Sequence, residues 1–542
     1  MAKVYGLFFG AHGFSTSLIV DGKIEYAVED ERIARVKSGW RWWKPPYDSI
    51  REIEKASGIT LEDADKIIIA DPTMHYCILQ FNNDEVNEEY AADLRNRLIK
   101  LKSKVSWMNH HEAHAYSTYY LSGFKDKTLV LTSDGGSYEG EYGTISLAED
   151  GVMKKIHSIP IATGASIANM WFYACTYYGW RGTKDEGKIM GMAGHGKYNE
   201  YLYNAISQCV NYKGNLEFYP GENGPTTDFI YRHLEKEGWF EGQKNRQDFA
   251  YNLQKYTEDI FMKYLTDVAK KYPQYRSLAL AGGVFANVKL NQIINESGLY
   301  DRVFITPAMS DEGLSLGAAI KGSIDIGDWD GVKQLETSFL GLEYSQEEID
   351  QQASRLSVTS SPLDYKEVGK LIHEGNIIAL FNGKFEFGPR ALGARSVMVR
   401  PTDAETHEVL NTRLERHEIM PFAPFIMSEY ADVVFDVPQS QHTAEFMTMC
   451  YTVRSEWADK IPAVIHRVDN TGRPQIVYKH KNPVFWNILN EYHKLSGIPV
   501  MLNTSFNGHG EPIVNTPEQA FAHLTKGTID YLIAGNKIYK KV

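Results

Sequence analysis

Short runs of β-branched and apolar residues alternate with longer helical patterns along almost the whole chain, and this alternation is the strongest constraint on its fold. The runs that predict β-strands are Val4–Phe9, Ser17–Val20, Lys66–Ala70, Leu129–Thr132, Ser277–Ala281, Val303–Ile305, Ile377–Phe381 and Pro499–Leu502. The patterns that predict α-helices are Tyr47–Ser57, Glu85–Leu101, Asp248–Lys271 and Ser345–Leu356. Alternation of this kind favours α/β layers over a β-sandwich or a helical bundle.

The chain is longer than one ordinary domain, because 542 residues correspond to two or three domains at about 100–200 residues each. A polar segment at 343–367 lacks apolar strands, and a new stretch rich in motifs begins after it. We therefore expect a first domain at 1–345 and a second at 360–542.

The composition restricts the setting in which the protein works. With 57 basic and 69 acidic side chains the net charge is −12, which argues against a protein that simply coats nucleic acid but leaves room for a local basic groove. The four cysteines form no CxxC pair, which excludes a thiolate zinc cage or a disulfide framework and suits a reducing compartment. Because the chain has no apolar run of about 18 residues and no signal-peptide pattern, we expect a cytoplasmic protein without a membrane partner.

Two segments share a pattern of strand, small-residue turn and second strand. They are Gly6–Ser17, with the sequence GLFFGAHGFSTS, and Leu129–Gly143, with the sequence LVLTSDGGSYEGEYG. Two β-hairpin phosphate loops are what a duplicated ATPase of the actin and sugar-kinase type requires. The alternative is a pair of unrelated hairpins.

A histidine cluster follows a short strand-like run in WMNHHEAHAYSTYY. If the segment is helical, His110 and His114 are four residues apart, so both imidazoles face one way and can share a metal. Asp311 follows the strand Val303–Ile305 and precedes a helix of small residues, which is where an α/β sheet offers ligands to a cleft. The alternative is a surface histidine cluster, with Asp311 serving only as a helix cap.

Three glycine-rich turns are compatible with phosphate. Leu278–Asn291 runs from a strand through Gly282-Gly283 into a helix, and the N-terminus of a helix favours phosphate oxygens. The other two are Asp185–Gly196, which contains a lysine, and Asp134-Gly135-Gly136. Each turn alone is weak evidence, since tight turns need glycine for conformational reasons.

The C-terminal part concentrates guanidinium and amide groups on loops. These residues are Arg390, Arg395, Arg400, Arg473, Asn503, Ser505 and Asn507. Arginines on rigid glycine- and proline-containing loops suit bidentate clamping of phosphate or carboxylate, and serine and asparagine add neutral donors. The alternative is surface salt bridging.

The chain resembles the O-carbamoyltransferase family that includes the nodulation-factor, cephamycin and tobramycin enzymes. The matching blocks are GAHGFSTSLIVDGKIEYAVEDERIARVK, HHEAHA, DEGKIMGMAGHG, GGVFANVKLN, DEGLSLGAA, FEFGPRALGARS, MPFAPF, IPAVIHRVDNTGRPQIV and GIPVMLNTSFNGHGEPIV. They occur in the order of the family and span nearly the whole sequence.

The resemblance implies an α/β protein with a duplicated ASKHA-type ATPase domain followed by a YrdC-like domain. The second domain would make carbamoyl-adenylate from carbamoyl phosphate and ATP with release of pyrophosphate, and the first would pass the carbamoyl group to a hydroxyl acceptor. The implied cofactors are ATP and a divalent metal, iron with manganese or magnesium as alternatives. A homodimer is one alternative for the oligomeric state, which the resemblance does not fix.

Individual roles follow from the motifs that match the family. The implied metal ligands are His110, His114 and Asp311, and the implied nucleotide residues are Asp134, Gly135, Gly136, Lys188, Gly282, Gly283 and Asn287. Arg473, Ser505 and Asn507 match residues that hold carbamoyl phosphate or the adenylate, Arg390 and Arg395 match the FGPRALG motif beside the cavity, and His12 matches a histidine near the acceptor hydroxyl.

The sequence departs from the family pattern at three places. Gly13 stands at the acidic position of the first loop, and Met420 stands where some members have an arginine before PFAP. The lysine that precedes this motif in the family is absent, with Leu414 or Glu415 in its place. Arg413 or Arg416 would then have to serve as the cation.

The sequence alone does not identify the acceptor of the carbamoyl group. Residues 40–46, WRWWKPP, interleave three tryptophans with two cations, and a basic stretch at Arg95, Arg97, Lys100, Lys102 and Lys104 precedes the histidines. This combination is typical of base stacking with phosphate contacts and would suit a 5-hydroxymethylated pyrimidine in DNA. Alternatively, the tryptophans pack in the core or grip a sugar or macrolide ring of a small-molecule acceptor.

Two further functions stay open besides ATP-dependent carbamoyl transfer. One is a tRNA threonylcarbamoyl-type or sugar-kinase-type enzyme, against which the C-terminal GPRALG and NTSFN blocks argue. The other is a nucleotide-binding scaffold without activity, motivated by the missing lysine.

Overall fold

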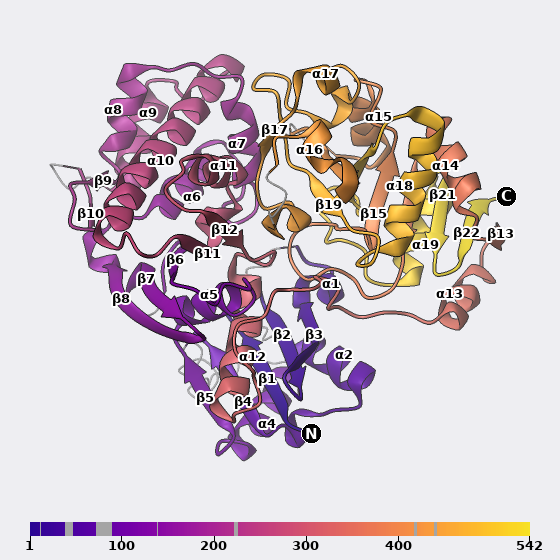
Figure 1. The fold of residues 1–542 in the computed structure, drawn as a ribbon, viewed down its shortest axis with the longest axis horizontal. Helices are drawn as coiled ribbons and strands as arrows, with labels where there is room; N and C mark the ends of the chain where they lie inside the picture. Colours follow the sequence, from indigo (N-terminus) through magenta and orange to yellow (C-terminus); the bar gives the residue numbers. More distant parts are fainter. Residues whose placement is uncertain are drawn as a thin grey trace. The chain divides into compact units, whose positions relative to one another are not determined.

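The computed structural model of the chain describes residues 1–10, 12–37, 47–71, 89–137, 139–221, 226–416, 420–437 and 442–542. Its packing divides the chain into two compact units (Figure 1). The first holds Met1–Lys23 and Thr60–Leu335, and the second holds Ile24–Gly39, Asp48–Ile59 and Glu336–Val542. The division into functional domains at 1–345 and 360–542 stays a prediction.

The first unit is built on two five-stranded sheets. The strands of the first sheet are β1 (Lys3–Phe8), β2 (Ser15–Val20), β4 (Lys66–Ala70), β5 (Val105–Met108) and the edge strand β3 (Lys23–Glu29), whose residues from Ile24 onward belong to the second unit. Those of the second sheet are β6 (Thr128–Ser133), β7 (Glu141–Glu149), β8 (Val152–Pro160), β11 (Ser277–Ala281) and β12 (Arg302–Ile305). A short hairpin, β9 (Asn211–Tyr212) with β10 (Phe218–Tyr219), stands apart from both.

The two sheets have the same topology. The first has the order β3-β2-β1-β4-β5, and the second, read in the corresponding direction, has the order β8-β7-β6-β11-β12. In each, the first strand pairs antiparallel with the second and parallel with the fourth: β1 with β2 and β4, and β6 with β7 and β11. This repetition confirms the duplicated architecture of the actin and sugar-kinase type and excludes two unrelated hairpins.

Two helices link the repeated halves. The α-helices of the first unit are α4 (Glu89–Lys100), α5 (His110–Tyr119), α6 (Ile167–Tyr177), α7 (Glu186–Ala193), α8 (Glu200–Ser207), α9 (Thr227–Lys236), α10 (Gln243–Lys271), α11 (Val288–Glu296) and α12 (Leu314–Asp325). Helix α5 follows the first sheet but packs on β6, β7 and β11 of the second, whereas α12 follows the second sheet but packs on β1, β2 and β4 of the first. The two helices also contact each other, so the start of each is held between the halves.

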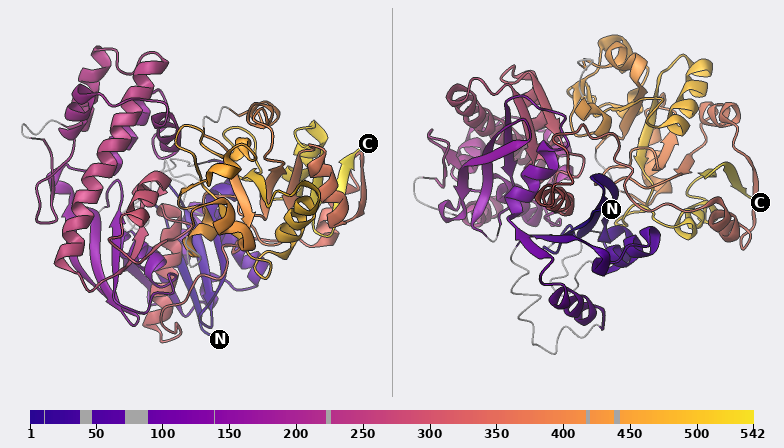
Figure 2. Two further views of the ribbon diagram at one scale, coloured as in Figure 1. Left: turned by 45° about the horizontal axis from the view of Figure 1, so that its top comes forward. Right: turned by 60° about the horizontal axis from the view of Figure 1, so that its bottom comes forward.

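Gly6 of β1 allows the close approach of α12 to the first sheet, because a Cβ there would lie 1.9 Å from the carbonyl oxygen of Ser315. Phe8, Ile68, Ala113, Leu314 and Ala318 are among the members of one buried cluster between them. The long helix α10 packs against α6, α7, α8 and α11, and it is seen along its length in the left view of Figure 2.

The second unit has one eight-stranded mixed sheet. Its strands are β13 (Val358–Pro362), β14 (Ile378–Phe381), β15 (Arg395–Val399), β16 (Ala423–Met427), β19 (Gln475–Val477), β20 (Val500–Ser505), β21 (Tyr531–Ala534) and β22 (Lys537–Lys541), with the order β13-β22-β21-β14-β15-β20-β16-β19. The pair β17 (Tyr451–Thr452) and β18 (Thr471–Gly472) lies outside this sheet. Its α-helices are α1 (Asp30–Ala34), α2 (Tyr47–Ser57), α13 (Gln346–Ala353), α14 (Tyr365–His373), α15 (Thr406–Arg413), α16 (Ala431–Val434), α17 (Ser455–Ala458), α18 (Pro483–Ser496) and α19 (Pro517–Lys526).

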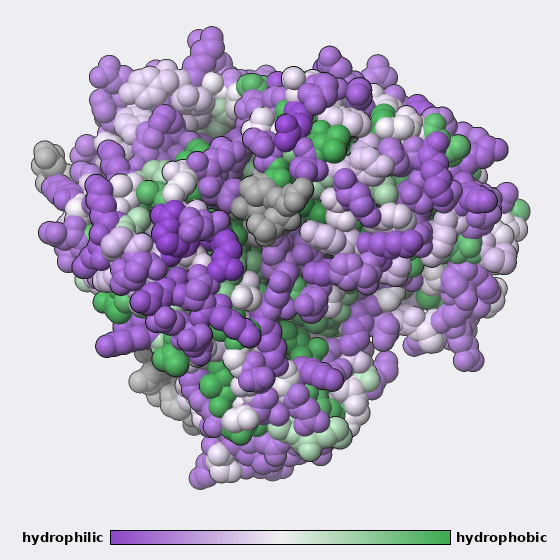
Figure 3. All heavy atoms as spheres, in the orientation of Figure 1, coloured by the Kyte–Doolittle hydropathy of each residue, from purple (hydrophilic) through white to green (hydrophobic). Residues whose placement is uncertain are grey.

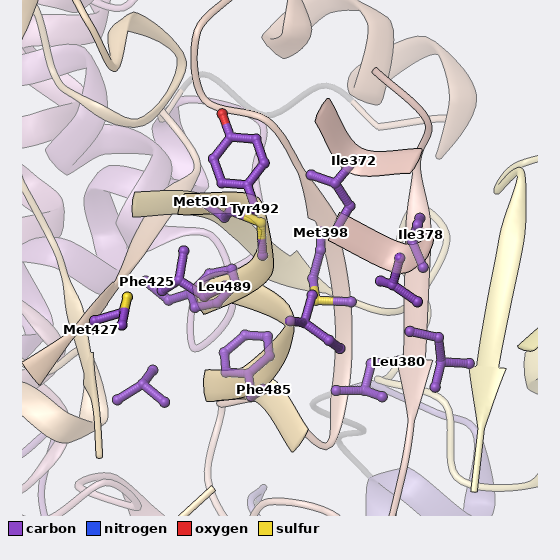
Figure 4. Packing of buried hydrophobic residues seen from close by; sticks show 14 of the residues in the cluster. Ile372, Ile378, Leu380, Met398, Phe425, Met427, Phe485, Leu489, Tyr492 and Met501 are labelled. Atoms are coloured by element: carbon purple, nitrogen blue, oxygen red, sulfur yellow. The ribbon is translucent and has the colours of Figure 1, made fainter. Parts of the chain in front are cut away.

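Helix α18 covers the middle of this sheet. Phe485 of α18 stacks on Phe425 of β16, with ring centroids 3.8 Å apart and the planes 10° from parallel. Figure 4 shows both rings within a cluster that includes Met398 and Met501 from the neighbouring strands. These contacts fix the central strands, and therefore the loops at their ends.

The strands predicted from apolar runs are confirmed to within a few residues, and the prediction for β4 and α2 agrees at both ends. The polar segment at 343–367 nevertheless contains the strand β13, which has the sequence VTSSP and is largely exposed. It escaped prediction because an edge strand of the sheet needs no apolar alternation.

The face of the molecule drawn in Figure 3 is mainly hydrophilic, with hydrophobic residues in small separate groups. Among the described residues, no helix combines the length and the apolar character that crossing a bilayer requires.

Candidate functional site

Helix α5 presents two buried imidazoles. Asn109 caps the helix by accepting a hydrogen bond from the backbone of Glu112 at 3.0 Å, so the helix begins at His110 and brings His114 to the same face one turn later. The exposed fractions of His110 and His114 are 3% and 0%. The alternative of a surface histidine cluster is therefore wrong.

Two carboxylates complete the group. Asp311 begins a short 3₁₀ turn (Asp311–Gly313) that leads into α12, and Asp134 directly follows β6. The Oδ1 atom of Asp311 lies 3.6 Å from the Nε2 atoms of both His110 and His114, and Asp134 Oδ2 lies 3.3 Å from His114 Nε2. One ligand atom from each of the four residues falls within 4.8 Å of the others.

These four residues fit a divalent cation. His110 Nε2, both ring nitrogens of His114 and Asp311 Oδ1 are buried without a hydrogen-bond partner. Buried polar atoms without partners are rare because they cost free energy, and a bound cation would satisfy His110 Nε2, His114 Nε2 and Asp311 Oδ1 at once. Two imidazoles with two carboxylates suit iron or manganese better than an all-oxygen set would.

The group is also electrostatically coupled. Burial lowers the pKa of His110, but Asp311 and Asp71 outweigh it and raise that pKa to about 9. Burial raises the pKa of Asp134, yet the imidazoles of His114 and His110 outweigh it and hold this pKa well below the usual value. Asp134 therefore stays ionised, as a metal ligand must.

His111 has a different task from its neighbours. Its Nδ1 lies 2.9 Å from the hydroxyl of Thr132, and its Nε2 lies 3.1 Å from the carbonyl oxygen of Glu141. Burial, followed by the charges of His110 and His114, lowers the pKa of His111 to about 3. It is a neutral residue that fastens α5 to the second sheet.

The first glycine loop brings His12 to the same place. Its Nδ1 lies 3.6 Å from Asp311 Oδ2, and 22% of the side chain is exposed. Gly13 has a φ of +72°, and a Cβ there would lie 2.9 Å from the Cβ of Asp311. A side chain at position 13 would therefore crowd Asp311 in this chain.

Asp134 ties together two of the predicted phosphate loops. Its Oδ1 accepts from the backbone N–H of Gly135 and its Oδ2 from that of Gly283, both at 2.6 Å. Gly282 has a φ of +106°, and a Cβ there would lie 2.1 Å from the carbonyl oxygen of Ser133, so only glycine fits. Asp134 thus belongs to the metal group as well as to the loop to which the sequence assigns it.

The other predicted nucleotide residues lie on the same unit but outside the metal group. Asn287 caps α11 by accepting from the backbone of Leu290 at 3.0 Å, and its amide also contacts Gln254. Lys188 Nζ pairs with Asp185 Oδ1 at 2.8 Å. Gly136 adopts a φ of +139° in the turn after β6. The nucleotide roles of these residues remain predictions.

Four motifs of the second unit meet at one edge of its sheet. Strands β15, β16 and β19 begin there and the antiparallel strand β20 ends there, because Ser396 pairs with Ser505, Ala423 with Asn503, and Phe425 with Gln475. FGPRALG precedes β15, MPFAPF runs into β16, TGRPQ leads into β19 and NTSFN closes β20. The predicted residues Arg395, Arg473 and Ser505 are thereby brought to one edge.

Arg416 is the cation that reaches the NTSFN segment. Its guanidinium donates to Thr504 Oγ1 at 2.9 Å, to the carbonyl and hydroxyl oxygens of Ser505 at 2.5 and 3.2 Å, and to Asn507 Oδ1 at 2.7 Å. Arg413 instead pairs with Asp530 at 2.7 Å. Of the two arginines left open by the sequence, Arg416 contacts the predicted site, and Leu414 is a buried apolar side chain.

Arg395 is fully buried and holds the FGPRALG loop. Its guanidinium donates to the carbonyl oxygens of Asn382, Gly383 and Ala394 at 3.0–3.2 Å, and burial lowers its pKa to about 10. Glu386 Oε1 accepts from the backbone N–H groups of Leu392, Ala394 and Arg395, which closes the loop from the other side. The alternative of a surface salt bridge applies to Arg400, which pairs with Asp403, but not to the buried Arg395.

A segment from the N-terminal part of the chain braces this loop. Glu29 Oε1 accepts from the backbone N–H of Gly388 at 2.5 Å, while Arg32 donates to Glu29 at 2.8 Å and to the carbonyl oxygens of Glu386 and Gly388. Arg35 donates to the carbonyl oxygens at positions 512 and 513, just after NTSFN. The block ERIARVK therefore supports the second unit, which the sequence did not predict.

Glu29 predicts a pH dependence of stability. Burial raises its pKa to about 7 although Arg32 opposes this, so folding favours the protonated form. Its stabilising contribution is complete below about pH 4.5 and is lost as the pH rises through 7, which lowers the free energy of unfolding by about 3 kcal/mol. Urea unfolding at pH 5 and pH 8 should show this loss in the wild type and a much smaller one in Glu29→Gln. Equal pH dependence in both proteins would contradict the assignment.

A small cavity of about 30 Å³ lies against β19. It is lined by Leu392 of the FGPRALG motif and Gln475 of the TGRPQ motif, together with Glu445, Tyr478 and Lys481. Lys481 is paired there with Glu445 at 2.9 Å.

The residues predicted to stack on an acceptor base, Trp40 to Pro46, lie outside the described residues. One charge of the basic stretch near α4 is neutralised, because Arg97 pairs with the carboxylate of Glu62 at 2.6 Å. This lowers the local positive charge on which binding of a DNA backbone would depend.

Both units carry sequence patterns of a single class of group-transfer enzymes. The pattern described as Carbamoyltransferase N-terminus matches residues 79–320, and that described as Carbamoyltransferase C-terminus matches residues 369–541. The chain belongs to the carbamoyltransferase family.

Relatives of similar length support this membership. The uncharacterized protein MJ1058 of Methanocaldococcus jannaschii is 33% identical over 85% of this chain and 78% of its own. The nodulation protein NolNO of Sinorhizobium fredii is 28% identical over 98% of this chain and 79% of its own. The nodulation protein NolO of Bradyrhizobium diazoefficiens is 31% identical over 80% and 79%.

Solved structures are similar at a lower level. The activator of 2-hydroxyisocaproyl-CoA dehydratase from Clostridium difficile matches 60% of this chain and 96% of its own at 10% identity and a TM-score of 0.33. The ROK hexokinase from Thermus thermophilus matches 60% and 99% at 14% identity and a TM-score of 0.31. These scores carry no conclusion about function.

Proposed function

We propose that the protein is an ATP-dependent O-carbamoyltransferase that activates carbamoyl phosphate as carbamoyl-adenylate and transfers the carbamoyl group to a hydroxyl acceptor. Membership of the carbamoyltransferase family supports the transfer itself. The observation that carries the proposal is that each unit holds its own polar site: a buried His–Asp group in the first and an arginine-rich sheet edge in the second.

The second unit, which we propose to be YrdC-like, makes the adenylate. The balanced step consumes one water: inorganic phosphate leaves carbamoyl phosphate, the resulting carbamate oxygen bonds to the α-phosphorus of ATP, and pyrophosphate departs. In this proposal Arg473, Ser505 and Asn507 bind the phosphate and carbamoyl groups, with Arg390 and Arg395 of the FGPRALG motif serving the same site. Arg416 holds Ser505 and Asn507 in place through its hydrogen bonds to both.

The first unit performs the transfer. The acceptor oxygen bonds to the carbamoyl carbon, AMP leaves, and the hydroxyl proton is released. His110, His114, Asp134 and Asp311 would hold a divalent metal, iron or manganese, which when bound supplies positive charge near the leaving phosphate. His12 orients the acceptor hydroxyl, because it is partly exposed while its Nδ1 faces Asp311.

One assay separates this proposal from its alternatives. The protein is incubated with carbamoyl phosphate and ATP, and pyrophosphate and AMP are measured. Pyrophosphate release that depends on carbamoyl phosphate supports the proposal. ADP without pyrophosphate would indicate a kinase, and no turnover of either substrate would indicate a nucleotide-binding scaffold.

For the acceptor we propose a hydroxyl group of a small molecule, with hydroxymethylated DNA as the competing candidate. The ion pair of Arg97 with Glu62 favours the small molecule, because it removes one positive charge from the basic stretch. Hydroxymethylcytosine-containing DNA, an aminoglycoside and a nucleoside should be offered at two salt concentrations, with a search for the mass of one added carbamoyl group. Modification of DNA that falls steeply with salt would overturn the choice.

A further inference from the structure

Asp71 is a buried carboxylate that neither the predicted metal ligands nor the nucleotide loops include. It directly follows β4, and its Oδ2 lies 3.1 Å from Nδ1 of His110. Only 7% of Asp71 and 3% of His110 are exposed, so this contact is shielded from water.

The fold itself holds Asp71 against His110. Strands β4 and β5 are parallel neighbours, so their carboxyl ends lie side by side, and α5 starts two residues after β5. The backbone N–H of Asp71 donates to the carbonyl oxygen of Met108 at 2.9 Å, and its φ is +68°. A left-handed conformation at a residue other than glycine costs about 1 kcal/mol and persists only where the surroundings impose it.

This contact decides which nitrogen of His110 is free. A histidine that ligates a metal is neutral, and an ionised carboxylate only accepts hydrogen bonds, so in the metal-bound form Nδ1 of His110 must carry the proton and donate it to Asp71. The Nε2 atom then has a free lone pair, and it is this atom that is buried without a partner, 3.6 Å from Asp311 Oδ1. Neither nitrogen of His114 has a hydrogen bond, so His110 differs from its neighbour in having this support.

We propose that Asp71 is a positioning residue for the metal site, which fixes the tautomer and the direction of His110 so that Nε2 points at the cation. Carboxylates that hold the second nitrogen of a ligating histidine typically strengthen metal binding by about 10–100-fold. The inference rests on the metal site proposed above.

The test measures metal affinity rather than activity. Metal-free protein is titrated with Mn²⁺, and the free ion is followed by electron paramagnetic resonance. Asp71→Asn should weaken binding by about 10–100-fold, whereas Asp325→Asn, a change at a partly exposed partner of Lys321 on α12, should leave it unchanged. Asp71→Gly is a second variant that removes the carboxylate and tolerates the positive φ, so its thermal midpoint without metal should not fall.

A double-mutant cycle shows whether Asp71 acts through His110. In a His110→Ala background, Asp71→Asn should have little further effect on Mn²⁺ affinity. An equal loss in both backgrounds would overturn the proposal, as would unchanged affinity of both Asp71 variants. If the wild-type protein binds neither Mn²⁺ nor Fe²⁺, the metal site itself is wrong, which is a separate result.

Discussion

His114→Ala should weaken metal binding and lower carbamoyl transfer, each by about 100-fold or more, because a direct ligand matters at least as much as its supporting residues. The side chain is completely buried, and its Nε2 lies 3.3 Å from Asp134 and 3.6 Å from Asp311, so no other group can take its place. Release of pyrophosphate from ATP and carbamoyl phosphate should be nearly unchanged, since we assign that step to the second unit.

Two controls accompany this variant. His233→Ala removes an exposed histidine of α9 in the same unit and should change neither metal content nor transfer. The thermal midpoint of metal-free His114→Ala shows whether the cavity left by the imidazole has destabilised the unit. Metal content and transfer equal to the wild type would mean that the four residues are not a metal site.

The fold was predictable wherever local pattern decides it. The apolar run at β4 and the amphipathic pattern of α2 have the periods of a strand and a helix, and the structure agrees with them. The equivalence of β1 and β6 was visible as two hairpins, but only the strand order shows that the whole half is repeated. Strand β13 was missed because its neighbours in the sheet, not its own sequence, make it a strand.

The candidate metal site was predictable in part. His110 and His114 have helical spacing, and Asp311 stands where a strand ends before a helix, so the sequence predicts all three. Asp71 and Asp134 also follow strands directly, and the same reasoning could have included them. The sequence could not show that these side chains lie close together in space, because α5 follows the first sheet in the chain but packs on the second.

In the second unit the limiting information is strand order. The neighbours β15, β20, β16 and β19 are not consecutive in the chain, so no local pattern shows that their motifs share an edge. The hydrogen bond between Glu29 and Gly388 was harder still to predict, because the two residues are 359 positions apart in the chain.

Arg416→Ala should reduce pyrophosphate release that depends on carbamoyl phosphate by about 100-fold and lower the free energy of unfolding by about 2–4 kcal/mol, because several buried acceptors lose a charged donor. Arg413→Ala is the matched control: its salt bridge with Asp530 is about one-third exposed, at 33% and 32%, so we expect a loss below about 1 kcal/mol and normal activity. Arg416→Lys should restore little, since an ammonium group cannot reach Thr504, Ser505 and Asn507 together.

Preformed carbamoyl-adenylate should rescue transfer in Arg416→Ala if the damage is confined to the activating step. If Arg413→Ala were the more harmful change, the cation that serves the NTSFN segment would have been assigned to the wrong arginine.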